Sequence, residues 1–271
     1  MTGSDDPSDN LSVATTLLHE AAADGARFVL TPEVTNCIST SRTHQRSVLK
    51  SESDDPTLVA LARTAKELDV WLLIGSLALK SEDDDRFVNR SFLISPDGEI
   101  AARYDKMHMF DVTLSDTETY RESDGYRPGD RAVVSHVDGT LVGLTICYDL
   151  RFPYLYRDLA HAGASIVTVP SAFSPDTGPA HWEPLLRARA IETGSFVLAP
   201  AQTGTHGASR GRARSTWGHS LIVDPWGRVI ADGGAEPGVI HADLDLSMVE
   251  DVRKRLPSLT HDRRYDVVRH G

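Results

Sequence analysis

The sequence predicts a layered α/β protein, in which helices cover β-sheets. Short apolar runs rich in β-branched residues alternate with amphipathic segments along the chain. Tight turns join some of these runs and helices join others, and this mixture favours a sandwich over a purely parallel sheet. No repeat, low-complexity block or linker divides the 271 residues, so we expect a single domain over residues 1–271.

The first half of the chain carries clear signals for where its elements begin. Apolar residues recur at helical spacing over residues 11–23. Asp54 and Asp55 are available as caps before Pro56, which suits the first turn of a helix. The tripeptide Pro96-Asp97-Gly98 is a turn between two apolar runs. We therefore expect helices over 11–23 and 56–68, strands over 27–30 and 70–79, and a hairpin of 91–95 with 100–104.

The second half continues the alternation of strands and helices. Turn residues bound its apolar runs, and Asp224-Pro225-Trp226-Gly227 is a clear example. The acidic stretch 81–85 predicts a solvated loop and not a domain boundary. We expect strands over 132–137, 141–147, 164–169, 196–201, 220–223 and 239–244, and helices over 154–162 and 181–193.

Composition and charge disfavour several classes of function. The chain has 28 Lys and Arg against 39 Asp and Glu, a formal net charge of −11, which disfavours a nucleic-acid or anionic-membrane partner. No apolar run approaches the roughly 18 residues of a membrane span, and the first residues do not resemble a signal peptide. Two cysteines cannot build a disulfide framework or a multi-cysteine zinc site, and the histidines show no ligand spacing. We expect a cytoplasmic protein without a metal or cofactor.

Three residues at predicted strand ends are candidates for chemistry. Cys147 ends an apolar strand just before a helix, whose N-terminus favours a nucleophilic thiolate. Glu33 ends another buried strand, where a carboxylate is uncommon unless it is paired or functional. Lys106 also follows a strand and lies among apolar residues. Taken singly, each has a plain structural explanation: a small buried cysteine, a strand-end carboxylate and a surface lysine with an apolar stem.

Together with their neighbours, these residues resemble the nitrilase superfamily of carbon–nitrogen hydrolases. The matching strings are Leu30-Thr31-Pro32-Glu33, residues 104–111 around Lys106, and residues 143–153 around Cys147, of which the last is the most specific. The resemblance extends to about Tyr265 and implies a four-layer α-β-β-α sandwich. Family members usually pair through helical faces, so a homodimer or a larger homo-oligomer is expected, with segments 154–162 and 181–193 as contributors.

The resemblance implies that a Glu-Lys-Cys triad hydrolyses a small linear amide. Cys147 would attack the amide carbon, Glu33 would move the proton, and a thioester would form before water releases the acid. Lys106 and the backbone N–H of Tyr148 would hold the oxyanion. The family has a second glutamate ahead of a Pro-Gly-Asp turn; Glu122 matches it and is expected to orient Lys106 and assist the substrate amide. A solvated loop acid is the alternative for Glu122.

The second half of the chain indicates a branch of the family. Residues 170–173, 177–183, 187–193, 218–220 and 223–227 resemble the branch that holds deaminated glutathione amidase and ω-amidase. The Phe-Pro pair after Arg151, the Ala-Ile-Glu-Thr string and the Val-Asp-Pro-Trp-Gly turn lie closer to the former. That activity cleaves deaminated glutathione to 2-oxoglutarate and cysteinylglycine. Because such a substrate carries carboxylates at both ends, the pocket should hold arginine or lysine.

Several residues are expected to meet this substrate. Arg151, four residues after Cys147, is the candidate for the 2-oxo-acid end. Phe173 and Thr177 are expected to line the pocket, although Phe173 could equally belong to the core. The arginine-rich loop 203–214 is expected to receive the distal carboxylate, with a mobile, solvated loop as the alternative. Cys37 matches no nucleophile pattern and is expected in a loop at or near the site.

One departure from the family concerns the start of the chain. Family members usually begin with a short buried strand ahead of the first helix, whereas residues 1–10 are polar and lead directly into the first predicted helix. The first strand is therefore expected to be absent from this sequence, with the true start upstream of Met1. A missing strand beside residues 27–33 would affect the stability of the sheet and the position of Glu33.

Other functions stay open on the sequence alone. Within the family they are an ω-amidase acting on 2-oxo-acid amides, an N-carbamoyl amine hydrolase and a nitrilase. Outside the enzymes, the alternative is a non-catalytic binding or scaffold protein with the same fold. Such a protein is expected to lose the glutamate, lysine or cysteine, and all three are present here.

Overall fold

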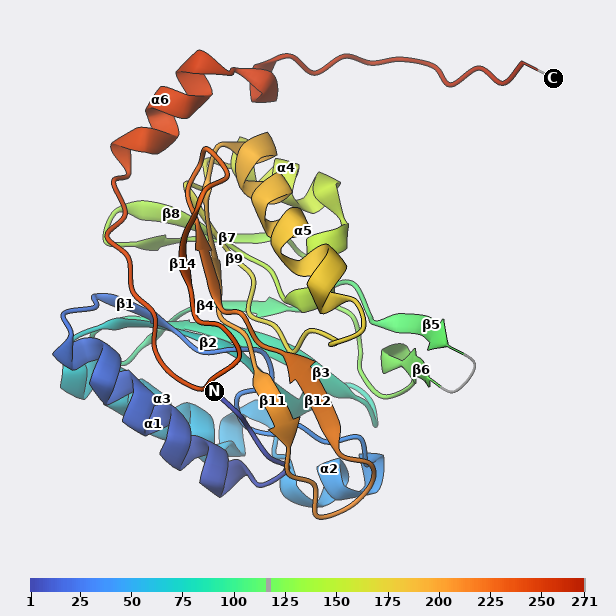
Figure 1. Cartoon of the computed structure of the whole chain (residues 1–271). Coiled ribbons are helices and arrows are strands. Elements are labelled where there is room, and N and C mark those ends of the chain that lie inside the picture. The colour runs from blue at the N-terminus through green and yellow to red at the C-terminus, as the bar shows by residue number, and fades with distance from the viewer. Residues whose placement is uncertain (116–117, 271) are drawn as a thin grey trace.

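The computed structural model describes residues 1–115 and 118–270, and its two main β-sheets carry helices on their outer faces (Figure 1). In the smaller sheet β1 pairs parallel to β2, and the other neighbours are antiparallel. The order of this sheet is β1 (Phe28–Leu30), β2 (Trp71–Lys80), β3 (Phe87–Ile94) and β4 (Ile100–Asp105). These strands match the predicted runs to within a few residues at each end.

Two helices, α1 (Pro7–Ala23) and α3 (Pro56–Leu68), cover the outer face of the smaller sheet. Each begins with a proline in its first turn and an aspartate as cap. The Asp6 carboxylate accepts the N–H of Ser8 at 2.8 Å. The Asp55 carboxylate accepts the N–H of Leu58 at 2.9 Å. The predicted start of the second helix is therefore confirmed at its capping residue.

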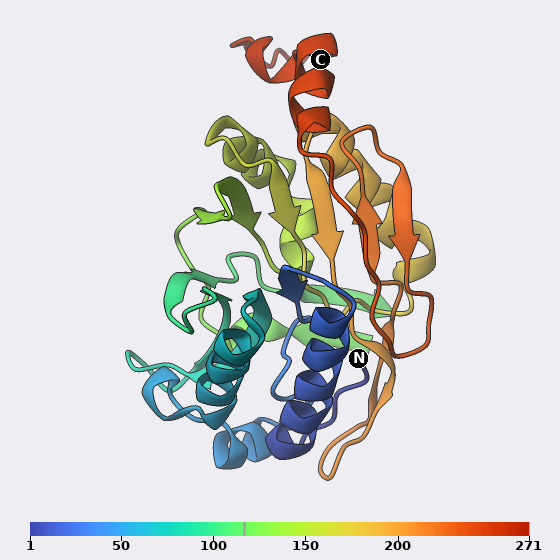
Figure 2. The ribbon, with the colours of Figure 1, turned by 90° about the vertical axis from the view of Figure 1, so that its left-hand side faces the viewer.

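The larger sheet is mixed, with parallel pairs at its centre and antiparallel pairs at its edges. Helices α4 (Pro153–His161) and α5 (Gly178–Thr193) lie on its outer face (Figures 1 and 2). Its order is β14 (Val229–Asp232), β13 (Leu221–Val223), β10 (Phe196–Ala199), β9 (Ile166–Thr168), β8 (Thr140–Leu144) and β7 (Val133–Val137).

The hydrophobic core follows the alternation of side chains along the strands. In β2, Leu72 and Ile74 belong to the apolar cluster under α1 and α3, whereas Leu73 belongs to the cluster shared with the larger sheet. Successive side chains of a strand point to opposite faces, so one strand serves both layers. Leu144 of β8 lies in the same cluster as Leu73. The ends of β1, β4 and β8, where the candidate residues lie, are thus anchored in packed strands.

Smaller elements complete the described chain, and most of them were not predicted. Among the described residues, no helix is long and apolar enough to cross a membrane. The C-terminal segment after η4 runs away from both sheets (Figure 1). The remaining elements are α2 (Arg42–Val48), β5 (Asp111–Ser115), β6 (Glu118–Arg121), β11 (Thr203–His206), β12 (Arg214–Trp217), α6 (Ser247–Arg255), and the 3₁₀ turns η1 (Glu52–Asp54), η2 (Glu122–Asp124), η3 (Cys147–Arg151) and η4 (Ser258–Thr260).

Three predictions about elements were wrong. Residues 239–244 form no strand, because no neighbouring strand bonds to them within the described chain. The strand predicted over 141–147 stops at Leu144, and Cys147 opens a 3₁₀ turn instead. Residues 203–214 are not a simple loop: β11 and β12 pair as a hairpin, with Thr203 opposite Trp217.

Candidate active site

Three side chains that are far apart in the sequence meet in one buried site. Glu33 follows β1, Lys106 follows β4, and Cys147 opens η3 after β8. The Lys106 ammonium Nζ lies 3.0 Å from Glu33 Oε1, and the Glu33 carboxylate lies close enough to the Cys147 thiol to raise its pKa. Their exposed fractions are 4% for Glu33, 2% for Lys106 and 8% for Cys147. The site therefore holds an acid, a cation and a thiol in an environment from which most water is excluded.

The backbone at Cys147 explains how its side chain is presented. Its φ is +48°, in the left-handed region that residues with a Cβ rarely adopt. The chain leaves β8 at Leu144 and turns sharply, and the Cys147 N–H donates to the carbonyl of Pro170 at 3.0 Å. A strained backbone of this kind persists only where the surroundings fix it, and such positions cluster at functional sites.

The Glu33 carboxylate is held by donors on both oxygens. Oε1 accepts from Asn89 Nδ2 at 2.9 Å and from Lys106, and Oε2 accepts the backbone N–H of Ala172 at 2.8 Å. Burial raises the pKa of Glu33, but the charges of Lys106 and Arg214 and these hydrogen bonds outweigh it and hold the pKa below its ordinary value. Glu33 is therefore ionised at neutral pH, as a general base requires.

Lys106 lies between two carboxylates. Its Nζ contacts Glu122 Oε1 at 3.0 Å and Oε2 at 2.9 Å, in addition to Glu33. The backbone N–H of Phe110 donates to Glu122 Oε2 at 2.6 Å and fixes that carboxylate. Burial lowers the pKa of Lys106, but the charges of Glu122 and Glu33 raise it well above its ordinary value. The structure thus places Glu122 at Lys106, where the resemblance implied an orienting role.

The protonation state of Cys147 differs from the prediction. A helix N-terminus was expected to favour the thiolate, whereas burial and the neighbouring charge of Glu33 raise the pKa of Cys147 well above its ordinary value, despite Lys106. The physical reason is that the thiol is buried and its neighbour Glu33 is negatively charged, and both disfavour a second negative charge on sulfur. At rest, the site therefore holds a protonated thiol beside an ionised carboxylate.

Asp149 fixes the turn that carries Cys147, and the sequence reasoning assigned it no role. It is fully buried and accepts the Tyr104 hydroxyl at 2.6 Å and the Ile146 N–H at 2.9 Å. The N–H and the Nδ1 of His108 also contact it, at 3.1 and 2.6 Å. An aspartate two residues after Cys147, directly after an apolar run, is the sequence signal that could have identified it.

Arg214 brings the arginine-rich segment to the triad. Its guanidinium donates to the carbonyl of Ala172 at 2.7 Å, and the N–H of the same residue donates to Glu33. Its positive charge is also among the causes that lower the pKa of Glu33. By contrast, Arg210 and Arg212 lie exposed in the hairpin tip. The predicted segment 203–214 thus reaches the site through Arg214, its last residue.

The predicted substrate-binding residues lie in two places. The Arg151 guanidinium lies over the rings of Tyr148 and Phe173, at 5.8 and 5.7 Å from their centroids, and contacts His181 Nδ1 at 3.2 Å. Phe173 is buried and packs on Trp182, so its ring belongs at least partly to the core. Thr177 is the half-buried cap residue of α5 and makes no side-chain capping bond. Arg151, Tyr148 and Phe173 therefore form one cluster, in which Tyr148 directly follows Cys147 in the chain.

Cys37 lies in a loop four residues after Glu33, as predicted, and its surroundings are apolar. Its side chain is 1% exposed and packs with Val34, Ile38 and Leu49 in a small apolar cluster. Burial and the charges of Asp5 and Asp6 raise its pKa to about 12. Cys37 is an inert core thiol, which makes it a useful control for Cys147.

Comparison with known proteins agrees with this geometry. A family model described as carbon–nitrogen hydrolase matches residues 2–254. The deaminated glutathione amidase of Yersinia enterocolitica is 39% identical over 241 residues, which cover 88% of this chain and 82% of that protein.

Two solved structures extend the likeness to the fold. The NitFhit protein of C. elegans has a TM-score of 0.88 at 33% identity, covering 97% of this chain and 63% of that one. Nit3 of Saccharomyces cerevisiae, described as a member of branch 10 of the nitrilase superfamily, has a TM-score of 0.84 at 29% identity, covering 97% and 93%. The predicted α/β class is therefore confirmed.

Proposed function

The chain belongs to the carbon–nitrogen hydrolase family, and from this membership we propose that Cys147, Glu33 and Lys106 hydrolyse a small linear amide. The observation that carries the proposal is a buried carboxylate 3.0 Å from a buried ammonium and close enough to a buried thiol to raise the pKa of that thiol. Amide hydrolysis needs a nucleophile, a proton carrier and a donor where negative charge develops, and these three groups supply each part.

The reaction follows from the resting protonation states. Glu33 takes the Cys147 proton as the sulfur attacks the amide carbon, so the thiolate forms only when substrate is present. The Lys106 ammonium and the N–H of Tyr148 stabilise the tetrahedral oxyanion. Glu33 then gives its proton to the leaving amine, which leaves a thioester on Cys147. In the second half, Glu33 activates water, which releases the acid and restores the thiol.

Glu122 keeps the lysine in its working position. It neutralises part of the charge around Lys106 and is itself fixed by the N–H of Phe110. A lysine held by two carboxylates stays protonated, so it donates to the oxyanion and does not act as a base.

The proposed substrate is deaminated glutathione, which yields 2-oxoglutarate and cysteinylglycine. Relatives at 38–39% identity carry the name deaminated glutathione amidase. Arg151, in the ring cluster next to Cys147, suits the 2-oxo-acid carboxylate, because a guanidinium binds a carboxylate with two parallel hydrogen bonds. We place the distal carboxylate near the hairpin tip between β11 and β12.

A substrate panel with matched cysteine variants tests this function. Deaminated glutathione, 2-oxoglutaramate, an N-carbamoyl amino acid and a nitrile are offered to the wild type, Cys147→Ala, Cys147→Ser and Cys37→Ala, and products are quantified. We expect the highest kcat/KM with deaminated glutathione, a loss of roughly a thousandfold or more in both Cys147 variants, and near wild-type activity in Cys37→Ala. Activity retained in both Cys147 variants would contradict the proposed mechanism. A preference for a different amide would contradict only the proposed substrate.

The finer architecture belongs to the same proposal. We assign the two sheets and their outer helices to a four-layer α-β-β-α sandwich in one domain. Tyr154 on α4 and Ile191 on α5 are 58% and 52% exposed, which supports a homodimer formed through these helices. Light scattering on the wild type and on Tyr154→Glu tests the dimer: the variant should be monomeric, and an unchanged mass contradicts this interface.

A further inference from the structure

Asn89 is a buried residue of β3 that bonds to both Glu33 and Lys106, and the proposed mechanism assigns it no step. Its Nδ2 donates to Glu33 Oε1 at 2.9 Å, and its backbone carbonyl accepts the Lys106 N–H at 2.9 Å. Among the residues that the structure describes, its Oδ1 is the only buried side-chain nitrogen or oxygen atom without a hydrogen-bond partner. Such an atom costs free energy, so its retention calls for a physical reason.

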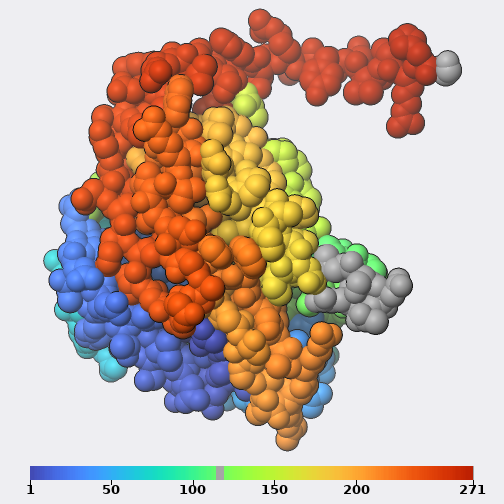
Figure 3. Space-filling model, in the orientation of Figure 1, coloured from blue at the N-terminus to red at the C-terminus, as the bar shows by residue number. Residues whose placement is uncertain are grey.

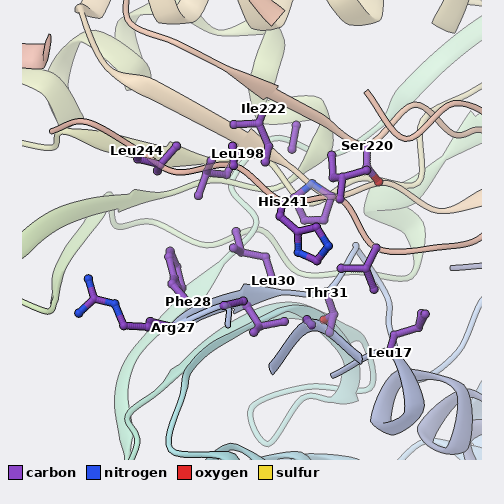
Figure 4. Close-up of a pocket in the computed structure, with 18 of the residues that line it drawn as sticks. Leu17, Arg27, Phe28, Leu30, Thr31, Leu198, Ser220, Ile222, His241 and Leu244 are labelled. Atoms are coloured by element: carbon purple, nitrogen blue, oxygen red, sulfur yellow. The ribbon is translucent and has the colours of Figure 1, made fainter. Parts of the chain in front are cut away.

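Solvent does not reach this oxygen. The Asn89 residue is 2% exposed. A cavity of about 660 Å³ lies between β1 and the larger sheet, but Asn89 is not among its lining residues. Figure 3 shows this cavity as a hollow between the red-orange C-terminal segment and the blue N-terminal helix. In Figure 4, Phe28, Leu30 and Leu198 lie around it, and all three are apolar. The Asn89 oxygen is therefore closed off in the interior.

The charge of Glu33 decides which way the Asn89 amide points. If the amide were turned around, Oδ1 would face a negatively charged oxygen at hydrogen-bond distance, and the two acceptors would repel. The nitrogen therefore faces Glu33, and the amide oxygen at the other end is left without a donor. In return the carboxylate gains a charge-assisted hydrogen bond, which is stronger than a neutral one. Asn89 is thus fixed as a donor toward Glu33.

The two oxygens of Glu33 differ in how many donors they meet. Oε1 accepts from Asn89 Nδ2 and from Lys106 Nζ, and two donors fill the two lone pairs of a carboxylate oxygen. Oε2 accepts from one described donor, the backbone N–H of Ala172 at 2.8 Å. A proton that arrives at Glu33 therefore finds room on Oε2 and not on Oε1.

The segment that bonds to Oε2 also bonds to the nucleophile. The carbonyl of Pro170 accepts the N–H of Cys147 at 3.0 Å, two residues before Ala172. The N–H of Ala172 also lies close enough to the Cys147 thiol to lower its pKa. This segment thus joins Oε2 to the thiol, whereas Oε1 is joined to the ammonium of Lys106.

We propose that Asn89 is a positioning residue, which reserves Oε1 of Glu33 for hydrogen bonds and so directs the moving proton to Oε2. The inference rests on the proposed function. The S–H bond of Cys147 breaks and an O–H bond forms at Oε2, while the sulfur electron pair bonds the amide carbon and the carbonyl pair moves onto its oxygen. When the C–N bond breaks, the same proton passes from Oε2 to the leaving nitrogen.

The pH dependence of Asn89→Leu tests this role. Leucine keeps the branched shape of asparagine but has no donor, so the ionised form of Glu33 loses one hydrogen bond. We expect kcat to fall about tenfold or more, with little change in KM, and the acid limb of kcat/KM to move up by about one pH unit. Asn89→Asp should move the limb further, because a second carboxylate disfavours ionisation of the first.

The surroundings of Glu33 are the same in these variants, and a matched control is available. The other charged and titratable groups that face Glu33 stay in place: Lys106 after β4, Cys147 on η3, Arg214 on β12 and, through Lys106, Glu122 on η2. The control is Asn36→Leu, since the buried Asn36 side chain exchanges hydrogen bonds with the backbone of Ala78, both at 2.9 Å. It should lower the free energy of unfolding without moving the acid limb.

Alkylation of Cys147 by iodoacetamide separates this proposal from the proposed function. It uses the same proton transfer to Glu33 but no amide, and its acid limb should move in both Asn89 variants. A moved limb in a protein that hydrolyses no amide would contradict the proposed function alone. Limbs of Asn89→Leu and Asn89→Asp that coincide with the wild type would overturn the role of Asn89, whether or not amides are hydrolysed. Asn89→Asp keeps the shape of the side chain and decides the question if Asn89→Leu does not fold.

Discussion

Cys147 and Glu33 are a neutral thiol and an ionised carboxylate that lie close enough to shift each other's pKa. This pairing differs from a pre-formed thiolate, because the raised pKa of Cys147 and the lowered pKa of Glu33 both keep the proton on sulfur. In the proposed mechanism, proton transfer to Glu33 accompanies attack on the substrate. The proposal therefore predicts that whatever keeps Glu33 ionised controls the rate at acid pH.

Arg214 is one such residue, and its replacement should move the pH profile. Arg214→Met removes a positive charge that lowers the pKa of Glu33, so the pKa rises and less of the carboxylate is ionised at a given acid pH. We expect the acid limb of kcat/KM to move to higher pH, with Arg214→Lys closer to the wild type. The matched control is Arg210→Met at the exposed hairpin tip, which should leave the limb in place. Coincident limbs in all four proteins contradict this role.

The approach of β1 to the site depends on a glycine in the neighbouring strand. A Cβ at Gly75 of β2 would lie 1.9 Å from the carbonyl oxygen of Thr31, 2.6 Å from that of Pro32 and 2.6 Å from Pro170 Cβ. Thr31 and Pro32 directly precede Glu33, and the carbonyl of Pro170 accepts the N–H of Cys147. The close packing of β1, β2 and the segment after β9 therefore sets the distance between Glu33 and Cys147.

Gly75→Ala should damage both stability and activity. The added methyl group must push backbone atoms apart, at a cost of about 1–3 kcal/mol for overpacking, and the shift separates Glu33 from Cys147. We expect a lower free energy of unfolding in urea and a reduced kcat. Gly238→Ala is the control, since nothing lies within 4 Å of its added Cβ. A Gly75→Ala protein with wild-type kcat would show that this packing does not position the site.

Local signals and long-range contacts explain what the sequence could predict. The Asp55-Pro56 cap and the alternating strands are local, so α3 and most strands were predicted close to their observed bounds. The strand over 239–244 has the right pattern but lacks a partner, and pattern alone cannot supply one. Asn89 and Ala172 reach Glu33 over 56 and 139 residues, and no spacing rule finds such contacts. Glu33, Lys106 and Cys147 were candidates from their places at predicted strand ends, and the family strings, which carry that distant information, joined them into one site.

Carboxylates that join distant parts of the chain make the whole molecule sensitive to acid. Glu33 links β1 to Lys106 and Ala172, and Asp5 accepts the N–H and hydroxyl of Ser209, both at 2.7 Å. Burial raises the pKa of each carboxyl group, but the charges or hydrogen bonds of their partners lower it by more. The pKa of Glu33 is therefore below its ordinary value of 4.5, and that of Asp5 is below 3.8. A depressed folded-state pKa contributes stability above the unfolded-state pKa and loses it as the pH falls.

The melting temperature should therefore fall steadily below about pH 5. Asp5→Asn should flatten part of this fall, because it removes one group that binds a proton on unfolding, while lowering stability at neutral pH. Calorimetry between pH 7 and pH 3 measures both. A melting temperature that stays constant, or rises, on acidification is inconsistent with these pKa directions.

The most direct test of the account is the mass of the enzyme during turnover. A reaction with deaminated glutathione is quenched in acid within its first turnovers, and the protein is digested and mapped by mass spectrometry. The proposed mechanism predicts a 2-oxoglutaryl group in thioester linkage on Cys147, its disappearance when hydroxylamine is added, and no adduct in Cys147→Ala. Steady hydrolysis without an acyl group on Cys147 in any quenched sample, or an acyl group on another residue, contradicts it.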